Sequence, residues 1–275
     1  MSFLFNQIDG LGRHVTRNLE YTLHVLLTFY LSVRAAIVDR TQSLRTLFGV
    51  VSSQIYFTGW QAVPLISVLA LGAGGVVILQ SSTNLNLLGG TEMIGKLLVI
   101  IIVRELGPLM TALVVIARSG TAVASEIGNM RANREIEALE SMGINPLSYI
   151  VFPRVLGGVI SVVSLAVYFT LISILGGYLL TRMLHDLPFG FYADSLARAI
   201  AVGDLGLFLL KNTFSGIIIF TVSCHQGLSV GRSPTEVPIA TTQAVVKAII
   251  YVVVFNFSVT ALFYLNELRK LGVLG

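Results

Sequence analysis

The sequence has few charged residues and almost no cysteine. Asp, Glu, Lys and Arg make up 12% of its 275 residues, against about a quarter in a typical soluble domain, whereas 55% of its residues are hydrophobic. We therefore expect lipid to surround most of the chain. The single cysteine, Cys224, excludes an internal disulfide framework and is expected as a small core residue of a membrane helix.

The sequence also lacks a group of side chains that could hold a metal or perform covalent catalysis. Ser119 and Ser125 have no histidine near them in the chain, and no His, Cys and carboxylate residues are spaced as metal ligands. The four histidines are scattered over the sequence: His14, His24, His185 and His225. Basic residues never form a run, which argues against nucleic-acid binding. We expect neither an enzyme nor a metalloprotein.

One segment comes close to a nucleotide-binding motif. Residues 90–97 read GTEMIGKL, which has the spacing of a phosphate-binding loop, but Leu97 stands where serine or threonine would hold magnesium. No hydrophobic strand precedes the segment, and a hydrophobic helix follows it. We interpret it as a turn. No cofactor is expected in this chain, and any ATP and magnesium would be bound by another polypeptide.

Long apolar runs dominate the rest of the chain. About 20 residues of helix cross roughly 30 Å of hydrocarbon, and four or five runs reach that length: residues 56–81, 94–117, 155–181, 205–224 and 244–265. Their connections are too short for a second folded domain. We predict an all-α membrane protein in which residues 51–275 form one domain. Pairs of small residues, such as Gly74-Gly75 and Gly157-Gly158, would allow close helix packing.

The segment of residues 13–40 has a different pattern. Apolar residues recur every three or four positions and charged residues interrupt them, which is typical of an amphipathic helix lying in the membrane interface. Residues 1–50 are therefore predicted to form an N-terminal cytoplasmic or interfacial region. The alternative is a sixth spanning helix over residues 21–38, although Arg34 and His24 would both be costly in hydrocarbon.

The distribution of basic residues predicts the orientation of the helices. The N-terminal region and the loop of residues 118–154 hold most of them, and the opposite side has only Lys96, Arg182, Arg198 and Lys211. The positive-inside rule then places the N-terminus and this loop in the cytoplasm. Five spans put the C-terminus on the far side, where Arg269 and Lys270 conflict mildly with the rule.

Charge and a proline interrupt the second apolar run. Arg104 and Glu105 lie about ten residues into it, where ionised side chains are expensive. Neighbouring helical residues do not face each other, so these two cannot simply neutralise one another. Pro108 lacks the N–H that would bond the carbonyl of Arg104, and it should kink the helix. Together these features indicate a substrate cavity or its gate; the alternative is an interhelical ion pair that fixes packing.

A short, highly charged helix is predicted after this run. Ile136, Leu139 and Met142 form a narrow apolar stripe, with Asn133 as the expected cap at the start and Gly143 at the end. A helix of this length cannot stand alone in water, so we expect it to dock on a partner. The alternative is a solvated connecting helix.

These segments resemble a known family. The motifs that carry the resemblance are Arg104-Glu105-Leu106-Gly107-Pro108, Ala117-Arg118-Ser119-Gly120, Glu126-Ile127-Gly128-Asn129-Met130-Arg131, Ile136-Glu137-Ala138-Leu139, Met142-Gly143, Pro146 and Pro153-Arg154. They are similar to the MlaE/YrbE-type permease subunit of ABC transporters, which move phospholipids or other hydrophobic molecules with an MCE-domain protein. The similarity extends over nearly the whole chain in length and helix order. One departure is Asn133-Arg134-Glu135, where relatives often have Thr-Glu-Gln.

The resemblance implies a specific architecture and specific sites. It implies an N-terminal interfacial helix, five transmembrane helices, a cytoplasmic coupling helix between spans 2 and 3 within residues 124–145, and a homodimer with a lipid cavity between its halves. The implied substrate-binding residues are Val77, Leu85, Leu88, Arg104 and Glu105. The implied contacts with the ATPase are Glu126, Arg131, Arg134, Glu135, Glu137, Leu139 and Met142.

The resemblance also implies partners and a location. The chain is expected as a multi-pass protein of a bacterial inner membrane that passes phospholipid to or from a periplasmic MCE-domain protein, expected as a hexamer, and so maintains outer-membrane lipid asymmetry. A cytoplasmic ABC ATPase, with a small STAS-domain protein bound to it, would hydrolyse the ATP. Two alternatives stay open: an ion-coupled secondary transporter using Arg104 and Glu105, and a scaffold that anchors partners without transport.

Overall fold

The computed structural model describes residues 2–38, 44–83, 92–185 and 189–270, and these ranges contain no strand, so the all-α prediction is confirmed. The helices are α1 (Ser2–Val38), α2 (Leu44–Thr58), η1 (Trp60–Ala62), α3 (Val63–Thr83), α5 (Glu92–Leu98), η2 (Val99–Leu106), α6 (Gly107–Val115), η3 (Ile116–Gly120), α7 (Thr121–Ala132), α8 (Glu135–Ser141), η4 (Leu147–Val151), α9 (Phe152–His185), α10 (Phe189–Ala199), α11 (Val202–Leu228), η5 (Pro234–Glu236) and α12 (Val237–Lys270). The segments η2, η3 and η4 are π-helical, and η1 and η5 are 3-10 turns.

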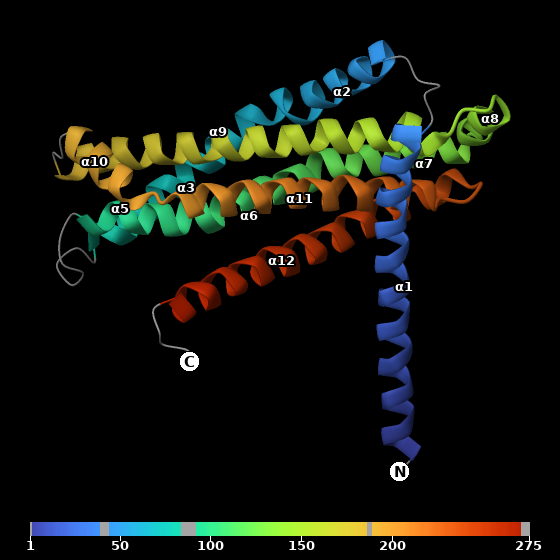
Figure 1. Ribbon diagram of the computed structural model, residues 1–275, viewed down its shortest axis with the longest axis horizontal. Coiled ribbons are helices and arrows are strands. Elements are labelled where there is room, and N and C mark those ends of the chain that lie inside the picture. The colour runs from blue at the N-terminus through green and yellow to red at the C-terminus, as the bar shows by residue number, and fades with distance from the viewer. Residues whose placement is uncertain (1, 39–43, 84–91, 186–188, 271–275) are drawn as a thin grey trace.

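Six stretches of the described helices are long and apolar enough to cross a membrane. Five run broadly along the long axis of the molecule (Figure 1): Leu47–Gln80, Gly95–Ala132, Leu147–Leu180, Val202–Leu228 and Pro234–Arg269. The sixth, Leu19–Val38 in α1, lies crosswise to these five spans. A helix perpendicular to the spans is parallel to the membrane plane, which supports the interfacial assignment of α1 over a sixth span.

The first span begins earlier than the sequence indicates, and it is broken. Residue 56 is its predicted start, whereas α2 starts at Leu44 and is joined to α3 through the 3-10 turn η1. Both α2 and α3 pack along α9. Gly157 of α9 leaves room for this close packing of α2: a methyl group on Gly157 would come 2.9 Å from Cβ of Gln54.

Close backbone contacts hold α9 at the centre of the bundle, between α3 and α11. A methyl group on Gly158 would overlap the ring of Phe220, and one on Gly74 would overlap the backbone of Ser173. The predicted role of these small residues in helix packing is therefore confirmed. In lipid, such van der Waals contact replaces the exclusion of water as the force between helices.

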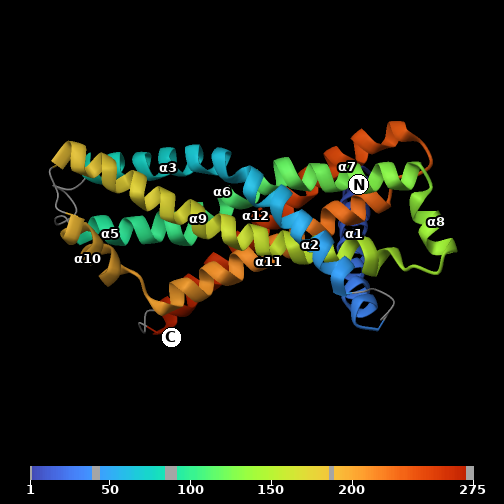
Figure 2. The ribbon, with the colours of Figure 1, turned by 90° about the horizontal axis from the view of Figure 1, so that it is seen from above.

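The short helix α10, between the third and fourth spans, is not predicted by the sequence analysis. It packs on α5, and its Tyr192 is buried with its hydroxyl donating to the carbonyl of Ile174 at 3.0 Å. Burial raises the pKa of this hydroxyl. Tyr192 therefore ties α10 to α9, and α10 lies at the pole of the molecule opposite α8 (Figure 2).

Candidate functional site

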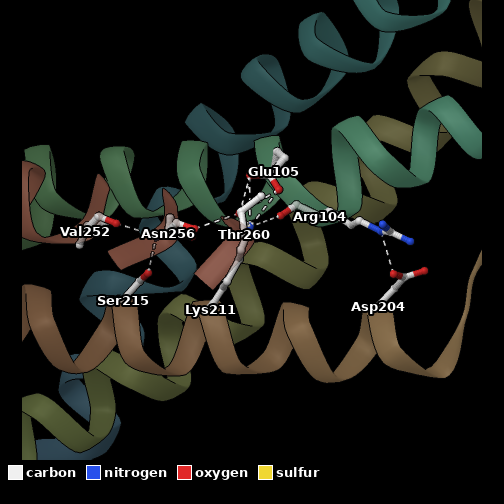
Figure 3. Close-up of polar contacts among 8 residues, drawn as sticks. All are labelled: Arg104, Glu105, Asp204, Lys211, Ser215, Val252, Asn256 and Thr260. Carbon is white, nitrogen blue, oxygen red and sulfur yellow. Dashed lines mark hydrogen bonds and ion pairs between the residues drawn. The ribbon is translucent and has the colours of Figure 1, made fainter. Parts of the chain in front are cut away.

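Four ionisable side chains meet inside the bundle, between η2 of the second span and α11 of the fourth (Figure 3). Arg104 Nε lies 2.7 Å from Asp204 Oδ1, close enough for an ion pair although the two groups are not aligned as a hydrogen bond. Asp204 is buried, and its other carboxylate oxygen accepts from the N–H of Ala201 at 3.0 Å. Asp204 therefore neutralises Arg104 and also caps the start of α11.

The second ion pair joins three spans. The Lys211 ammonium on α11 lies 3.1 Å from both carboxylate oxygens of Glu105 and 2.7 Å from the hydroxyl of Thr260 on α12. The Thr260 hydroxyl is itself 3.0 Å from Glu105 Oε1. Lys211 is fully buried, whereas 40% of the Glu105 side chain is exposed. The pair is thus sealed on the lysine side and open on the carboxylate side.

Lys211 also contacts the backbone of the second span. Its ammonium group donates to the carbonyl of Arg104 at 2.7 Å, and in an α-helix that carbonyl would accept from residue 108. Pro108 has no N–H to offer. The sequence predicts a kink at Pro108. The structure shows the π-helical segment η2 directly before it, which ends at Leu106, where the N–H of Gly107 bonds the carbonyl of Ile102.

A polar chain extends the site along α12. The amide of Asn256 donates to Ser215 Oγ at 3.1 Å and to the carbonyl of Val252 at 2.9 Å, and the carbonyl of Asn256 accepts from Thr260. The four ionised groups sum to zero charge, and each sits beside a partner of opposite sign. Removing one member of a buried pair typically costs about 3–5 kcal/mol because the other charge is left uncompensated.

The structure separates the predicted roles of Arg104 and Glu105. As the sequence predicts, the two side chains do not neutralise each other. Each has its own counter-ion on α11. Arg104 is only 17% exposed, so the alternative of an interhelical ion pair describes it well. Glu105 keeps an open face. Its carboxylate remains the candidate for substrate contact at this site.

The other predicted substrate residues lie elsewhere. Val77 is buried at 5% exposure in a cluster with Ile78, Leu98 and Tyr192, so within one chain it packs on its own neighbours. Leu85 and Leu88 lie outside the described residues. Contact of these three positions with lipid stays a prediction.

Sequence reasoning missed Asp204, Lys211 and Thr260. It counted Lys211 only among the basic residues of the far side, whereas Lys211 is fully buried within the fourth span. A signal was present: Asp204 and Lys211 are seven residues apart, which puts both on one face of a helix. Two opposite charges on one face of an apolar run match the two opposite charges of the second span.

The cytoplasmic helix predicted after the second span exists as α8, but its start differs. Asn133 is not its cap: the cap position is Arg134, which has a left-handed backbone (φ 62°) and makes no side-chain cap hydrogen bond. The predicted end is confirmed, because Gly143 has φ 75°. The N–H groups of Gly143 and Ile144 bond the carbonyls of Glu140 and Leu139 at 2.9 and 3.0 Å, which is a Schellman ending.

The apolar stripe of α8 is divided between the bundle and the outside. Ile136 is buried at 1% exposure and Leu139 packs against the same core, whereas Met142 is 66% exposed. Among the charged positions predicted to meet the ATPase, Arg134 and Glu135 are exposed, and Arg131 and Glu137 are half-buried. Glu126 is paired with Arg154 at 2.6 Å. The outward surface of α8 and its C-cap therefore combines the apolar side chain of Met142 with exposed charged residues.

α8 lies beyond the level of α1. In Figures 1 and 2, α8 and the adjoining ends of the spans project past α1 on the side away from α10. An interfacial α1, as the sequence predicts, would leave this end of the molecule outside the hydrocarbon. The lengths of the spans agree: the second has 38 residues, about 57 Å of helix, against roughly 30 Å of hydrocarbon.

These features define a class of protein: a multi-pass helical membrane protein with a charge-neutral polar site inside its bundle and a short helix projecting from one end. The model of the family described as Permease MlaE matches residues 51–262. The chain belongs to the MlaE permease family.

Known relatives cover most of the chain. A "Probable ABC transporter permease protein" of Rickettsia bellii is 31% identical over 79% of this chain and 84% of its own length. The "Intermembrane phospholipid transport system permease protein MlaE" of Haemophilus influenzae is 28% identical over 83% of this chain and 88% of its own length. A probable ABC transporter permease of Synechocystis is 28% identical over 77% of this chain and 80% of its own length.

Proposed function

We propose that this chain is the permease subunit of an ABC transporter that moves phospholipids, or related hydrophobic molecules, between the bacterial inner membrane and a periplasmic MCE-domain assembly. Membership of the MlaE family and the names of the relatives support the proposal. The chain performs no covalent chemistry itself. A separate cytoplasmic ABC ATPase hydrolyses the ATP.

One structural observation carries the proposal. The second span, Gly95–Ala132, contains Glu105 of the buried ion pairs. Its last part is α7, and α8 follows directly after it. Arg134 is 29 residues after Glu105, about 44 Å along the helix axis. A force applied to α8 from outside the membrane would therefore act on the helix that carries the polar site.

The proposed assembly is a homodimer with a lipid cavity between its halves. The open carboxylate of Glu105 lies at the cavity wall, and Val77, Leu85 and Leu88 contact acyl chains. The N-terminus and α8 are cytoplasmic, and the C-terminus is periplasmic. Transfer of lipid to or from a hexameric MCE protein would maintain outer-membrane asymmetry, and a small STAS-domain protein binds the ATPase.

An ion-coupled secondary transporter is less well supported. That alternative depends on an unpaired charge in the membrane, whereas Arg104 and Glu105 each have a counter-ion within 3.1 Å. A proton relay through Glu105 would first have to break its contact with Lys211. We therefore do not propose ion coupling for this site.

The exposed face of α8 offers the test. In the purified permease–ATPase complex, Met142→Asp should lower lipid-stimulated ATP hydrolysis about ten-fold, equivalent to about 1.4 kcal/mol of lost interaction. Val202→Asp is the matched control, because Val202 is also exposed (88%) but begins α11 at the opposite pole. Full stimulation in an intact Met142→Asp complex would refute coupling through α8. Mass spectrometry of co-purified lipid identifies the cargo.

A further inference from the structure

A second projecting surface lies beside α8. It comprises the turn of residues 229–236 between α11 and α12, together with the first turns of α12, and we call it the α11–α12 corner. Ile239 in this corner is 60% exposed, and Arg232, Thr235 and Glu236 are also exposed. Figures 1 and 2 show that the end of α11 and the start of α12 project past α1 on the same side as α8.

Ile239 lies outside the hydrocarbon. The hydroxyls of Thr22 on α1 and Tyr251 on α12 are 2.7 Å apart, so Tyr251 is at the level of the interfacial helix. Ile239 comes twelve residues before Tyr251 in the same helix, about 18 Å further out along the axis. Lipid covers the exposed apolar residues of the spans, but it does not reach Ile239.

The corner is joined to the base of α8. Val230, Val237 and Ala240 form a small buried cluster against Ala132, the last residue of α7. A methyl group on Gly128 of α7 would come 3.1 Å from Val230. Since Ala132 is two residues before Arg134, a movement of α8 and α7 is transmitted to the corner by direct packing.

Hydrogen bonds within the turn also fix the shape of the corner. Glu236 Oε2 accepts from the N–H of Gly231 at 2.7 Å, which closes the turn on itself, and Pro234 starts η5. The hydroxyls of Ser233 and Thr235 are 2.7 Å apart. A surface with its conformation set in advance loses little entropy when a partner binds.

We infer that the α11–α12 corner is a second docking surface for the same ATPase that seats on α8. The inference rests on the proposed function. α8 has only seven residues, about 10 Å of helix, whereas a stable interface takes roughly 800 Å² and 20–30 residues from each partner. An ATPase seated on α8 must therefore cover neighbouring surface, and the corner is joined to α8 through α7 and carries an exposed apolar residue.

Cysteine protection tests the inference. Cys224 is fully buried, so the unmodified chain provides the unreactive background for a water-soluble maleimide. Three single variants are compared in lipid nanodiscs, with and without the cognate ATPase: Ile239→Cys in the corner, Met142→Cys at α8, and Val202→Cys at the opposite pole. We expect the ATPase to slow labelling of the first two about ten-fold or more and to leave Val202→Cys unchanged.

The outcomes separate this inference from the proposed function. Protection at Met142→Cys with none at Ile239→Cys overturns the second surface and leaves the seat on α8 intact. If the ATPase protects neither position, both the second surface and the seat on α8 are overturned. If Ile239→Cys is unreactive without the ATPase, lipid or another part of the chain covers it and the inference fails. Ile239→Asp should also weaken ATPase binding about ten-fold while the thermal midpoint of the permease alone stays unchanged.

Discussion

Lys211 donates from its ammonium group to the carbonyl of Arg104 at 2.7 Å, the carbonyl to which Pro108 cannot supply a backbone N–H. The same ammonium group is the counter-ion of Glu105. One buried side chain on the fourth span therefore completes both the backbone bonding and the charge balance of the second span.

Replacing Lys211 should destabilise the permease strongly. Lys211→Met leaves the Glu105 carboxylate without its counter-ion, so we expect a loss of about 3 kcal/mol, at the lower end for a broken buried pair because Glu105 is partly exposed. Denaturation in detergent measures the loss. The double variant Lys211→Met/Glu105→Gln should recover more than 1 kcal/mol of it. Additive losses in the double variant would show that the two side chains are not coupled.

Pro108→Ala should make the protein less dependent on Lys211. Alanine supplies the missing N–H to the carbonyl of Arg104, so the cost of Lys211→Met should fall by about 1 kcal/mol, the usual net contribution of a hydrogen bond. Pro64→Ala is the control, since Pro64 is an exposed residue in the first turn of α3. Equal costs of Lys211→Met in both backgrounds would contradict the proposed link between Pro108 and Lys211.

Asp204 combines a charge and a cap, and two substitutions separate them. Asp204→Asn keeps an acceptor for the N–H of Ala201 and loses only the charge beside Arg104. Asp204→Ala loses both and should be less stable than Asp204→Asn by about 1 kcal/mol. The comparison is made by thermal unfolding in detergent. Identical stabilities would mean that the cap contributes nothing measurable to α11.

Arg134 has a left-handed backbone that glycine adopts without steric cost. Arg134→Gly should therefore stabilise the isolated permease by about 1 kcal/mol, whereas Arg134→Ala should not, because alanine retains the Cβ that clashes. Unfolding of the permease without its partners measures both. A gain that is the same for alanine would trace the effect to the lost charge and not to the backbone.

Features that depend on local patterns could be predicted from the sequence. The apolar runs indicate the spans by their length, and Gly143 ends α8 because glycine has little cost at positive φ. Asn133 failed as a cap, although its residue type is favoured there. Arg134 takes the cap position instead, with a left-handed backbone. The burial of Ile136 against the bundle determines where α8 begins.

Length, apolar runs and the spacing of small residues by themselves determined that this chain is an all-α membrane protein with crowded helices and charge inside its second span. The tertiary structure alone decided that Asp204 and Lys211 neutralise that charge, since ion pairing depends on distances of about 3 Å between helices a hundred residues apart. It also decided which side of α8 is free. Ile136 and Leu139 fit the same periodic pattern as Met142, and only packing against the other helices distinguishes the buried positions from the exposed one.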